Sequence, residues 1–180
     1  DLHGTELWRT DGTASGTVLV KDCRTGPDGS HPGGLTAADG LLFFTADDGA
    51  TGTELWCSDG TAGGTRLVFD LQPGVDGSGP GPMAALGAMV LFEANAGAAG
   101  RELWRSNGQP GGTQFLKDLN PGSAGAASAD WTRLGPRLIF TAALGGGRRL
   151  WSSDGTVAGT VNLTGCGSTP LLTVAGTRAY

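Results

Sequence analysis

The residues of this chain that could do chemistry do not assemble into an activated nucleophile with a base. A Ser-His-Asp mechanism needs a histidine base held by a carboxylate, and the chain has only His3 and His31. His3 lies near the first residue, and His31 is followed by proline in a segment that we expect to be a solvated crossover. The adjacent Asp47 and Asp48 are not singled out for glycosidase chemistry, because a polar turn explains them well. We therefore expect no catalytic residues and no enzyme activity.

Patterns that ligate metal ions are equally sparse. Asp28-Gly29-Ser30 and Asp76-Gly77-Ser78 recur, but the third copy reads Ala124-Gly125-Ala126. Calcium takes six or more oxygen ligands, and the chain has no spacing like that of an EF-hand. We expect no cofactor. An ion held by backbone carbonyls in a central channel stays open as an alternative.

The three cysteines are Cys23, Cys57 and Cys166, and their spacing does not suggest a zinc site. Cys23 and Cys166 occupy equivalent repeat positions, where the other copies carry Leu71 and Leu119. We interpret them as small buried apolar residues. A disulfide or a reactive thiol remains open.

Composition excludes several classes of partner. The formal net charge is −5, and no basic stripe suggests nucleic acid. No apolar run approaches the roughly 20 residues of a membrane-spanning helix. The chain is 38% apolar, which is enough for a core, and its 34 glycines stand at turn-like positions. We expect a single folded domain over residues 1–180.

A motif repeats along the whole chain. Glu-Leu-Trp ends at Trp8, Trp56 and Trp104, and Arg-Leu-Trp ends at Trp151, so the tryptophans are 48, 48 and 47 residues apart. An Asp-Gly or Asn-Gly pair follows each copy, and a Gly-Thr pair follows that. A period this long and regular predicts a repeat architecture. Residues that recur in every copy are expected to build the copy.

One repeat contains four short strand signals, which we name A to D. They cover residues 35–38, 41–46, 53–58 and 65–71, and turn signals separate them. Four antiparallel strands in about 48 residues are typical of a β-propeller blade. Leucine and tryptophan are adjacent in strand C and point to opposite faces. We therefore expect a structural, buried role for the motif tryptophans, Trp8, Trp56, Trp104 and Trp151.

The sequence thus predicts an all-β fold, a β-propeller of four-stranded antiparallel blades. Three blades cover residues 35–71, 83–119 and 131–165. Residues 171–180 supply strands A and B, and residues 5–23 supply strands C and D, of a composite blade that closes a four-bladed ring. A segment of a longer array, or half of an eight-bladed ring made by two chains, are the alternatives.

The repeats read ELWRTDGTASGT, ELWCSDGTAGGT, ELWRSNGQPGGT and RLWSSDGTVAGT. This pattern resembles the bacterial ELWxxDGT repeat family, and the resemblance covers nearly the whole chain. It implies a propeller-like scaffold that is secreted or displayed at the cell surface, and it transfers no catalytic residues. The third copy departs at Asn107 and Gln109, and the fourth carries Arg149 in place of glutamate.

The B–C and D–A connections are long and variable, and they lie on one face of the predicted disc. Because loops on a rigid frame carry binding residues, we expect a protein or glycan partner there. The hypotheses are a non-enzymatic extracellular binding or assembly module, a carbohydrate-binding lectin, and an accessory propeller domain of a larger secreted enzyme. Trp131 is the only tryptophan outside the motif, and we expect it to be buried near the channel. The chain is expected to be a monomer or a homodimer. The candidates for the binding face are Arg24, Asp28, His31, Asp47, Asp48, Asp76, Asn95, Arg101, Asp130, Arg148 and Arg149.

Overall fold

The computed structural model describes residues 2–97, 100–122, 125–163, 174–175 and 178–179. All regular elements among these residues are β-strands, so none of them forms a helix that could cross a membrane. The strands are β1 (Leu7–Arg9), β2 (Val18–Lys21), β3 (Gly33–Ala38), β4 (Leu41–Asp47), β5 (Thr53–Ser58), β6 (Arg66–Phe69), β7 (Met83–Leu86), β8 (Met89–Asn95), β9 (Arg101–Ser106), β10 (Gln114–Lys117), β11 (Ala129–Leu134), β12 (Arg137–Leu144), β13 (Gly147–Ser153), β14 (Val161–Leu163), β15 (Val174–Ala175) and β16 (Arg178–Ala179).

The expected repeat is one four-stranded antiparallel sheet. Strands β3 to β6, β7 to β10 and β11 to β14 each form such a sheet, with neighbours in sequence also neighbours in space. They fill positions A to D of the predicted repeat in order. The two middle strands have the same register in all three sheets, where Phe44 lies opposite Trp56, Phe92 opposite Trp104 and Phe140 opposite Trp151.

Tight turns explain why strands A and B pair so regularly. Ala38 lies opposite Leu41, so that only Asp39 and Gly40 form the connection. Both residues have positive φ, at 48° and 77°, as a type I′ turn requires. The twist of this turn matches the twist of the strands. The Asp-Gly pair that predicted a hairpin here therefore produces one.

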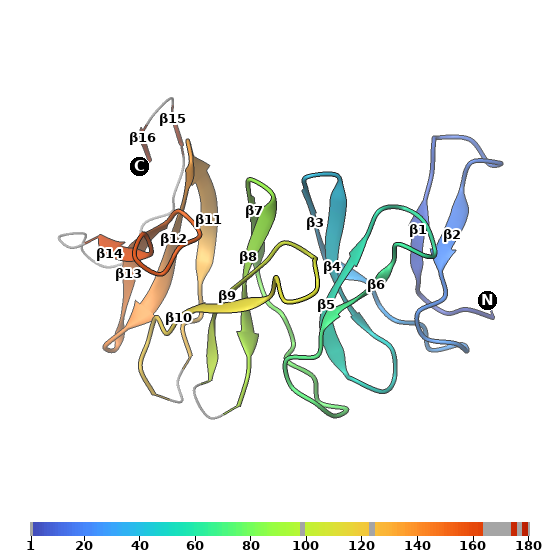
Figure 1. Cartoon of the computed structure of the whole chain (residues 1–180), viewed down its shortest axis with the longest axis horizontal. Coiled ribbons are helices and arrows are strands. Elements are labelled where there is room, and N and C mark those ends of the chain that lie inside the picture. The colour runs from blue at the N-terminus through green and yellow to red at the C-terminus, as the bar shows by residue number, and fades with distance from the viewer. Residues whose placement is uncertain (1, 98–99, 123–124, 164–173, 176–177, 180) are drawn as a thin grey trace.

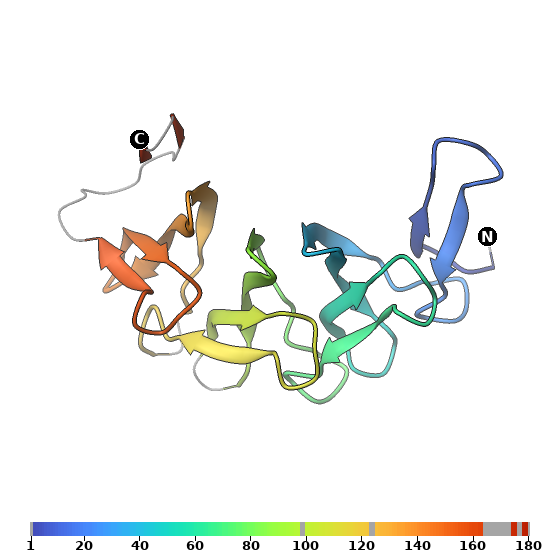
Figure 2. The same cartoon turned by 45° about the horizontal axis from the view of Figure 1, so that its top comes forward.

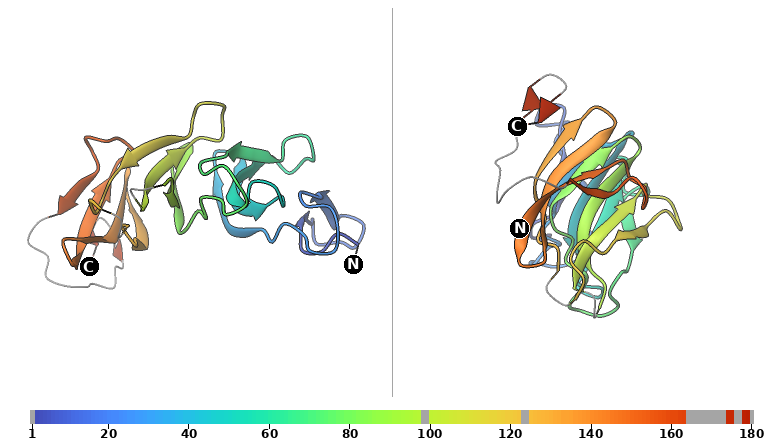
Figure 3. Two further views of the ribbon diagram at one scale, coloured as in Figure 1. Left: turned by 90° about the horizontal axis from the view of Figure 1, so that it is seen from below. Right: turned by 90° about the vertical axis from the view of Figure 1, so that its left-hand side faces the viewer.

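The sheets stand in a row that bends into an open arc. Figure 1 shows the N-terminal hairpin and the C-terminal hairpin at opposite ends of this row, and Figure 2 shows the curvature. Seen along the row in the right-hand view of Figure 3, the sheets lie one behind another. The long loops gather along one edge of the row, at the bottom of Figure 1, and the A–B turns lie at the opposite edge.

Successive sheets pack face to face through side chains that alternate along each strand. In β5, Leu55 belongs to an apolar cluster shared with the following sheet, whereas Trp56 belongs to a cluster shared with β1 and β2. In β9, Leu103 packs toward the following sheet and Trp104 toward the preceding one. Neighbouring residues of a strand point to opposite faces. The motif leucine therefore faces forward along the row and the motif tryptophan faces backward.

The two ends of the row differ from the expectation. β1–β2 and β15–β16 form separate two-stranded sheets, so the composite blade of residues 171–180 and 5–23 is not formed within this chain. Of residues 164–180, only 174–175 and 178–179 are described, and Cys166 lies outside the described residues. The side chains packed between sheets set the angle between one sheet and the next. The repeat pattern does not encode that angle. Three complete sheets turn too little to bring the ends together (Figure 2).

The exposure of the tryptophans follows from this open row. Trp56 and Trp151 are 5% and 4% exposed because a sheet precedes each of them, and Trp104 is partly buried. Trp8 faces the position before the first sheet and is 48% exposed. The same motif residue is thus a packing wedge or a surface residue, depending on whether a neighbouring sheet is present.

Packing between sheets makes a testable prediction for stability. Leu91 is 0% exposed in the cluster between the second and third complete sheets. We expect Leu91→Ala to lower the free energy of unfolding by about 2–5 kcal/mol. Val157 is 61% exposed on a turn, and Val157→Ala should change it by less than about 0.5 kcal/mol. Urea unfolding of both variants checks this, and equal losses would contradict the packing described above.

Candidate functional site

The motif glutamate anchors the crossover from strand D to the next strand A. Glu6 is 7% exposed. It accepts hydrogen bonds from the Ser30 amide at 2.8 Å, the Ser30 hydroxyl at 2.6 Å, and the amides of Cys23 and Arg24. Backbone and hydroxyl donors are thus the partners of this buried carboxylate. The crossover is therefore fixed to the start of strand C in its own repeat.

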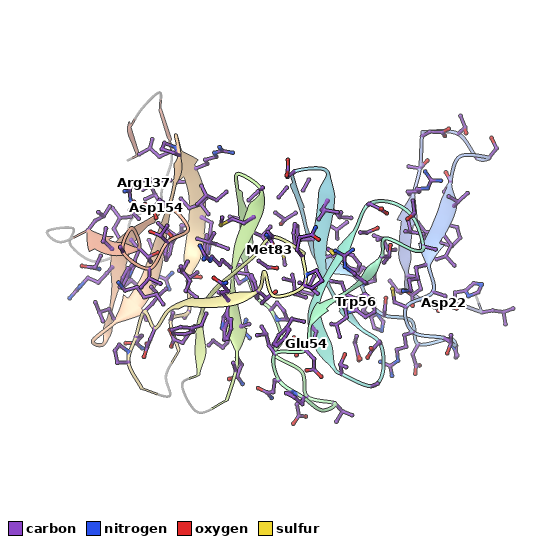
Figure 4. All side chains as sticks on the ribbon, in the orientation of Figure 1. Asp22, Glu54, Trp56, Met83, Arg137 and Asp154 are labelled. Atoms are coloured by element: carbon purple, nitrogen blue, oxygen red, sulfur yellow. The ribbon has the colours of Figure 1, made fainter. Side chains whose placement is uncertain are left out.

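The second repeat has the same anchor. Glu54 is fully buried, and it accepts from the amide and the hydroxyl of Ser78 and from the amide of Gln72. Figure 4 labels Glu54 on the side of the row where the long loops gather. Burial raises the pKa of Glu54 above its ordinary value, although the hydrogen bonds from Ser78 work in the opposite direction. The motif glutamates therefore hold the backbone at the loop edge of these two repeats in place.

The third repeat lacks one part of this anchor. Ala126 stands where Ser30 and Ser78 stand in the earlier copies, so no hydroxyl reaches Glu102. Glu102 accepts from the Leu119 amide at 2.8 Å through Oε2, whereas its buried Oε1 has no hydrogen-bond partner in the described structure. Burial raises the pKa of Glu102 to about 7 despite the Leu119 bond, and the charges of Asp118 and Glu93 add to the rise.

The C–D turn is closed by the other polar residues of the motif. Asp59 Oδ1 accepts from the Thr61 amide at 2.9 Å and its hydroxyl at 2.7 Å, and these bonds lower the pKa of Asp59. A Cβ at Gly64 would lie 2.0 Å from Asp59 Oδ1, which explains the glycine. Equivalent bonds form at Asp11 and Asp154. At Asn107 only the Gln109 amide donates to Oδ1. The polar motif residues are thus engaged within their own repeat.

Several predicted binding-face residues tie the loops to one another. Arg24 Nη1 lies 2.7 Å from Asp47 Oδ2, and Arg24 Nη2 lies 3.6 Å from Asp28 Oδ2. The first pair joins a D–A crossover to the end of strand B in the next sheet. Asp48 accepts from the amides of Ala50 and Thr51 and from the Thr51 hydroxyl. Burial alone would raise the pKa of Asp48, but these bonds outweigh it and lower the pKa.

The third complete sheet has its own network at this edge. The Thr141 hydroxyl donates to Asp130 Oδ2 at 2.9 Å and accepts from Arg148 Nη2 at 2.6 Å. Arg148 Nη1 also donates to the Ala127 carbonyl at 3.0 Å. Arg149, which replaces the anchoring glutamate, is exposed. The structure therefore brings Asp130 and Arg148 together through Thr141, and it leaves Arg149 at the surface.

The remaining candidates are spread along the loop edge. His31 is exposed, with φ at 49°, and its amide donates to the Thr5 carbonyl at 3.0 Å. Asp76 is exposed, and Asn95 is half-buried and accepts from the Gly97 amide at 3.3 Å. Arg101 lies beside Gly81, where an added Cβ would lie 2.5 Å from its Nη2. These four residues do not form one cluster with the networks of Arg24 and Arg148.

A histidine–carboxylate pair was not expected from the sequence. His3 Nδ1 lies 2.7 Å from Asp22 Oδ2, an arrangement that orients the base in a catalytic triad. Cys23, next in the chain, has its pKa raised to about 11, by burial first and by Glu6 second. A nucleophilic thiol needs a lowered pKa. Burial also raises the pKa of Cys57, and both cysteines are free and pack in the clusters between sheets.

A hollow at the inner edge of the row was missed by the sequence reasoning. It is a depression open to solvent, with a volume of about 560 Å³, and it touches strands A of all three complete sheets, one strand B and the end of one D–A crossover. We call it the inner hollow, and its lining residues are Gly34, Leu35, Thr36, Thr45, Pro80, Gly81, Pro82, Met83 and Trp131.

Three equivalent repeat positions give the inner hollow its apolar surface. Leu35, Met83 and Trp131 are spaced 48 residues apart, and Leu35 is 57% exposed. Trp131 stacks on Phe140 with ring centroids 4.5 Å apart, and its Nε1 donates to the Ser128 hydroxyl at 3.1 Å. The spacing was visible in the sequence. The sequence could not show that the first residues of the A strands face open space and not a filled centre.

Over the described part of the chain, no group of three or more His, Cys, Asp or Glu side chains could hold a metal ion. No family model matches the sequence, and no curated protein does.

Among solved structures, the chain is similar to a prolyl endopeptidase, a propeller-containing protease studied for the role of inter-domain dynamics in catalysis and specificity. The TM-score is 0.59 at 15% sequence identity. The match covers 98% of this chain and 26% of that chain, so the protein spans about a quarter of the length of its structural neighbour. At this identity the likeness concerns the fold alone.

The incomplete anchor in the third repeat predicts a pH dependence of stability. The folded pKa of Glu102, about 7, lies above the ordinary value of 4.5, so the folded state holds this proton more tightly. Glu102 therefore lowers stability progressively as the pH rises from 4.5 to about 7. We expect Glu102→Gln to remove this loss, and Ala126→Ser to reduce it by restoring the hydroxyl.

Urea unfolding near pH 5 and near pH 8 measures the effect. Ala62→Ser, at an exposed turn position, is the control and should leave the difference between the two pH values unchanged. A Glu102→Gln variant that loses as much stability as the unchanged chain over this range would refute the assignment.

Proposed function

We propose that the chain is the structural core of a β-propeller and that its three complete sheets are blades. Three features support the proposal: the sheets share one strand order, each of the first two complete sheets contributes to an apolar cluster on both of its faces, and the row curves with strands A on its inner side (Figure 2). The likeness to a propeller-containing protease agrees with it. Continued curvature of the row would produce a ring with the inner hollow facing its centre.

Within this framework, we propose a non-enzymatic binding module. The observation that carries the proposal is the inner hollow, where Leu35, Met83 and Trp131 present apolar groups at equivalent positions of three sheets. The hydroxyls of Thr36 and Thr45 line the same space. Concave sites with apolar walls and a few polar groups are typical of ligand-binding pockets. Glutamate anchors hold the crossovers of the first two repeats in place, which favours a preformed site.

Trp131 favours glycan binding as the second candidate. Phe140 covers one face of its ring, and the indole also lines the inner hollow. An aromatic ring held by a neighbour is a rigid platform with both apolar area and a polar edge. A sugar ring could stack there while the nearby threonine hydroxyls accept or donate hydrogen bonds. Weak sites of this kind gain avidity when several copies act together.

The wider setting of the module also remains a proposal. The resemblance to the ELWxxDGT repeat pattern supports a secreted or cell-surface location. The protease likeness, which covers 26% of that chain, supports the third candidate, an accessory propeller domain beside an enzyme. The intact mass of the native protein distinguishes this candidate, because an accessory domain requires a substantially longer polypeptide.

Peptide and glycan arrays probed with the labelled chain test the binding proposal. We expect binding to at least one array, and we expect Leu35→Ser to weaken peptide binding about tenfold, since it removes one buried apolar contact. If the ligand is a glycan, Trp131→Ala should abolish binding while Leu35→Ser has a smaller effect. Val157→Ser, on an exposed C–D turn, is the matched control. A ligand insensitive to both hollow variants would place the site elsewhere.

A further inference from the structure

A pocket on the second complete sheet is separate from the inner hollow. It has a volume of about 230 Å³, and its lining residues are Ala96, Gly100, Glu102, Trp104 and Phe115. The two sets of lining residues do not overlap. Glu102 and Trp104 share one face of β9, and Phe115 of β10 lies opposite Trp104. The pocket therefore lies on the face turned toward the preceding sheet, where Trp104 packs, and we call it the outer pocket.

Glu102 brings an incompletely paired carboxylate to the outer pocket. The residue is 1% exposed, and its Oε1 has no hydrogen-bond partner among the described residues. The Ala126 amide donates to the Arg101 carbonyl at 2.8 Å. In the first repeat, the equivalent Ser30 amide donates to Glu6. A buried carboxylate that lacks a partner is costly, so Glu102 favours a cation beside it.

The charges that act on Glu102 are negative. Burial raises the pKa of Glu102 to about 7, and the charges of Asp118 and Glu93 add to the rise. In the part of the chain that the structure describes, no ion pair involves these three carboxylates. Arg101 precedes Glu102 in β9 and therefore points to the opposite face of the sheet. A cation in the outer pocket would meet a site of net negative charge.

The chain itself places a lysine ammonium over the motif tryptophan where β1 and β2 meet the first complete sheet. Lys21 Nζ lies 5.8 Å from the centroid of the Trp56 ring and donates to the Thr65 carbonyl at 2.8 Å. Where the second and third complete sheets meet, Lys117 Nζ donates to the equivalent Thr160 carbonyl, also at 2.8 Å. An ammonium within about 6 Å of an aromatic face is attracted by the ring.

Phenylalanine takes the place of this lysine where the first and second complete sheets meet. Phe69 lies opposite Leu55, as Lys21 lies opposite Leu7, and Phe69 is 52% exposed. Lys21 and Lys117 are the only lysines of the chain, and both bind carbonyls of other sheets. The face that carries the outer pocket therefore receives no lysine from this chain.

We propose that the outer pocket binds a primary ammonium group, which lies over the Trp104 ring and beside the Glu102 carboxylate. Phe115 stands edge to face with Trp104, with ring centroids 5.5 Å apart, and its 49% exposure leaves the pocket open to solvent. Aromatic faces and carboxylates both attract an ammonium. Because the volume is smaller than that of drug-sized pockets, the ligand is either one lysine side chain of a partner or a small free alkylamine.

An NMR titration of the ¹⁵N-labelled chain with n-butylammonium chloride tests the inference. We expect the indole N–H signal of Trp104, assigned by its loss in Trp104→Phe, to shift and saturate with a dissociation constant of about 1 mM. Sodium chloride and 1-butanol at the same concentrations are the controls for ionic strength and for the alkyl chain. A Trp104 signal that ignores n-butylammonium, or that responds equally to 1-butanol, would overturn the proposal.

Two substitutions change the charge at the site without removing the aromatic rings of the outer pocket. Glu102→Gln should raise the dissociation constant at least about tenfold, because it removes the counter-charge. Phe69→Lys should abolish binding, because it introduces an ammonium at the position of Lys21 and Lys117. Phe69→Met has a side chain of similar length without charge, and it should leave the constant unchanged. Unchanged affinity in Glu102→Gln or in Phe69→Lys would contradict the assignment.

A capped Gly-Lys-Gly peptide and its norleucine counterpart distinguish the two sources of the ammonium. Tighter binding of the lysine peptide than of n-butylammonium supports a lysine of a partner protein, and weaker binding supports a free amine. Equal binding of the norleucine peptide would overturn the role of charge. Trp131→Ala, in the inner hollow, should leave n-butylammonium binding unchanged. The outer pocket and the site proposed in the inner hollow can therefore fail independently of each other.

Discussion

The structure depends on burial of apolar side chains between successive sheets of the row. Consecutive side chains of a strand point to opposite sides, so Phe43 and Phe44 lie in different interfaces although they are neighbours in sequence. A sheet with apolar groups on both faces therefore gains stability from a neighbouring sheet on each side. The same constraint fixes the direction of the row, since the motif leucine and tryptophan of one strand always face opposite neighbours. It also makes the ends of the row the exceptional places in the molecule.

A second constraint acts at the loop edge. Glycine-rich crossovers bury their backbone close to strand C, and the motif glutamate satisfies the amides that this close approach removes from water. Gly77 illustrates the fit, because a Cβ there would lie 2.5 Å from the Thr53 amide nitrogen. These anchors hold the crossovers in place as they run to the inner edge of the row. There Pro80 and Met83 line the inner hollow. The scaffold and the candidate site are therefore products of the same repeated contacts.

The repeat units could be predicted from the sequence, because they follow from local pattern. Local sequence determines the structure of three features of the repeat. They are the Asp39-Gly40 turn, the apolar strand B, and the adjacent leucine and tryptophan. The angle between sheets could not be predicted, since it depends on side chains packed from several repeats at once, and the ring expected to close within one chain stays open. The site residues were missed for a related reason. Charged loop residues such as Arg24 and Asp47 looked available, but the structure pairs them, while Trp131 was expected to be buried near the channel.

A double-mutant cycle tests the central claim, that the motif leucine faces the following sheet and the tryptophan faces the preceding one. Leu103 shares a cluster with Trp151 and not with Trp56. Residues in one packed cluster couple by about 0.5–3 kcal/mol, whereas distant residues are additive within about 0.5 kcal/mol. We predict coupling of the first size between Leu103→Ala and Trp151→Phe, and additivity between Leu103→Ala and Trp56→Phe, both measured by urea unfolding. Additivity in the first pair together with coupling in the second would contradict the account.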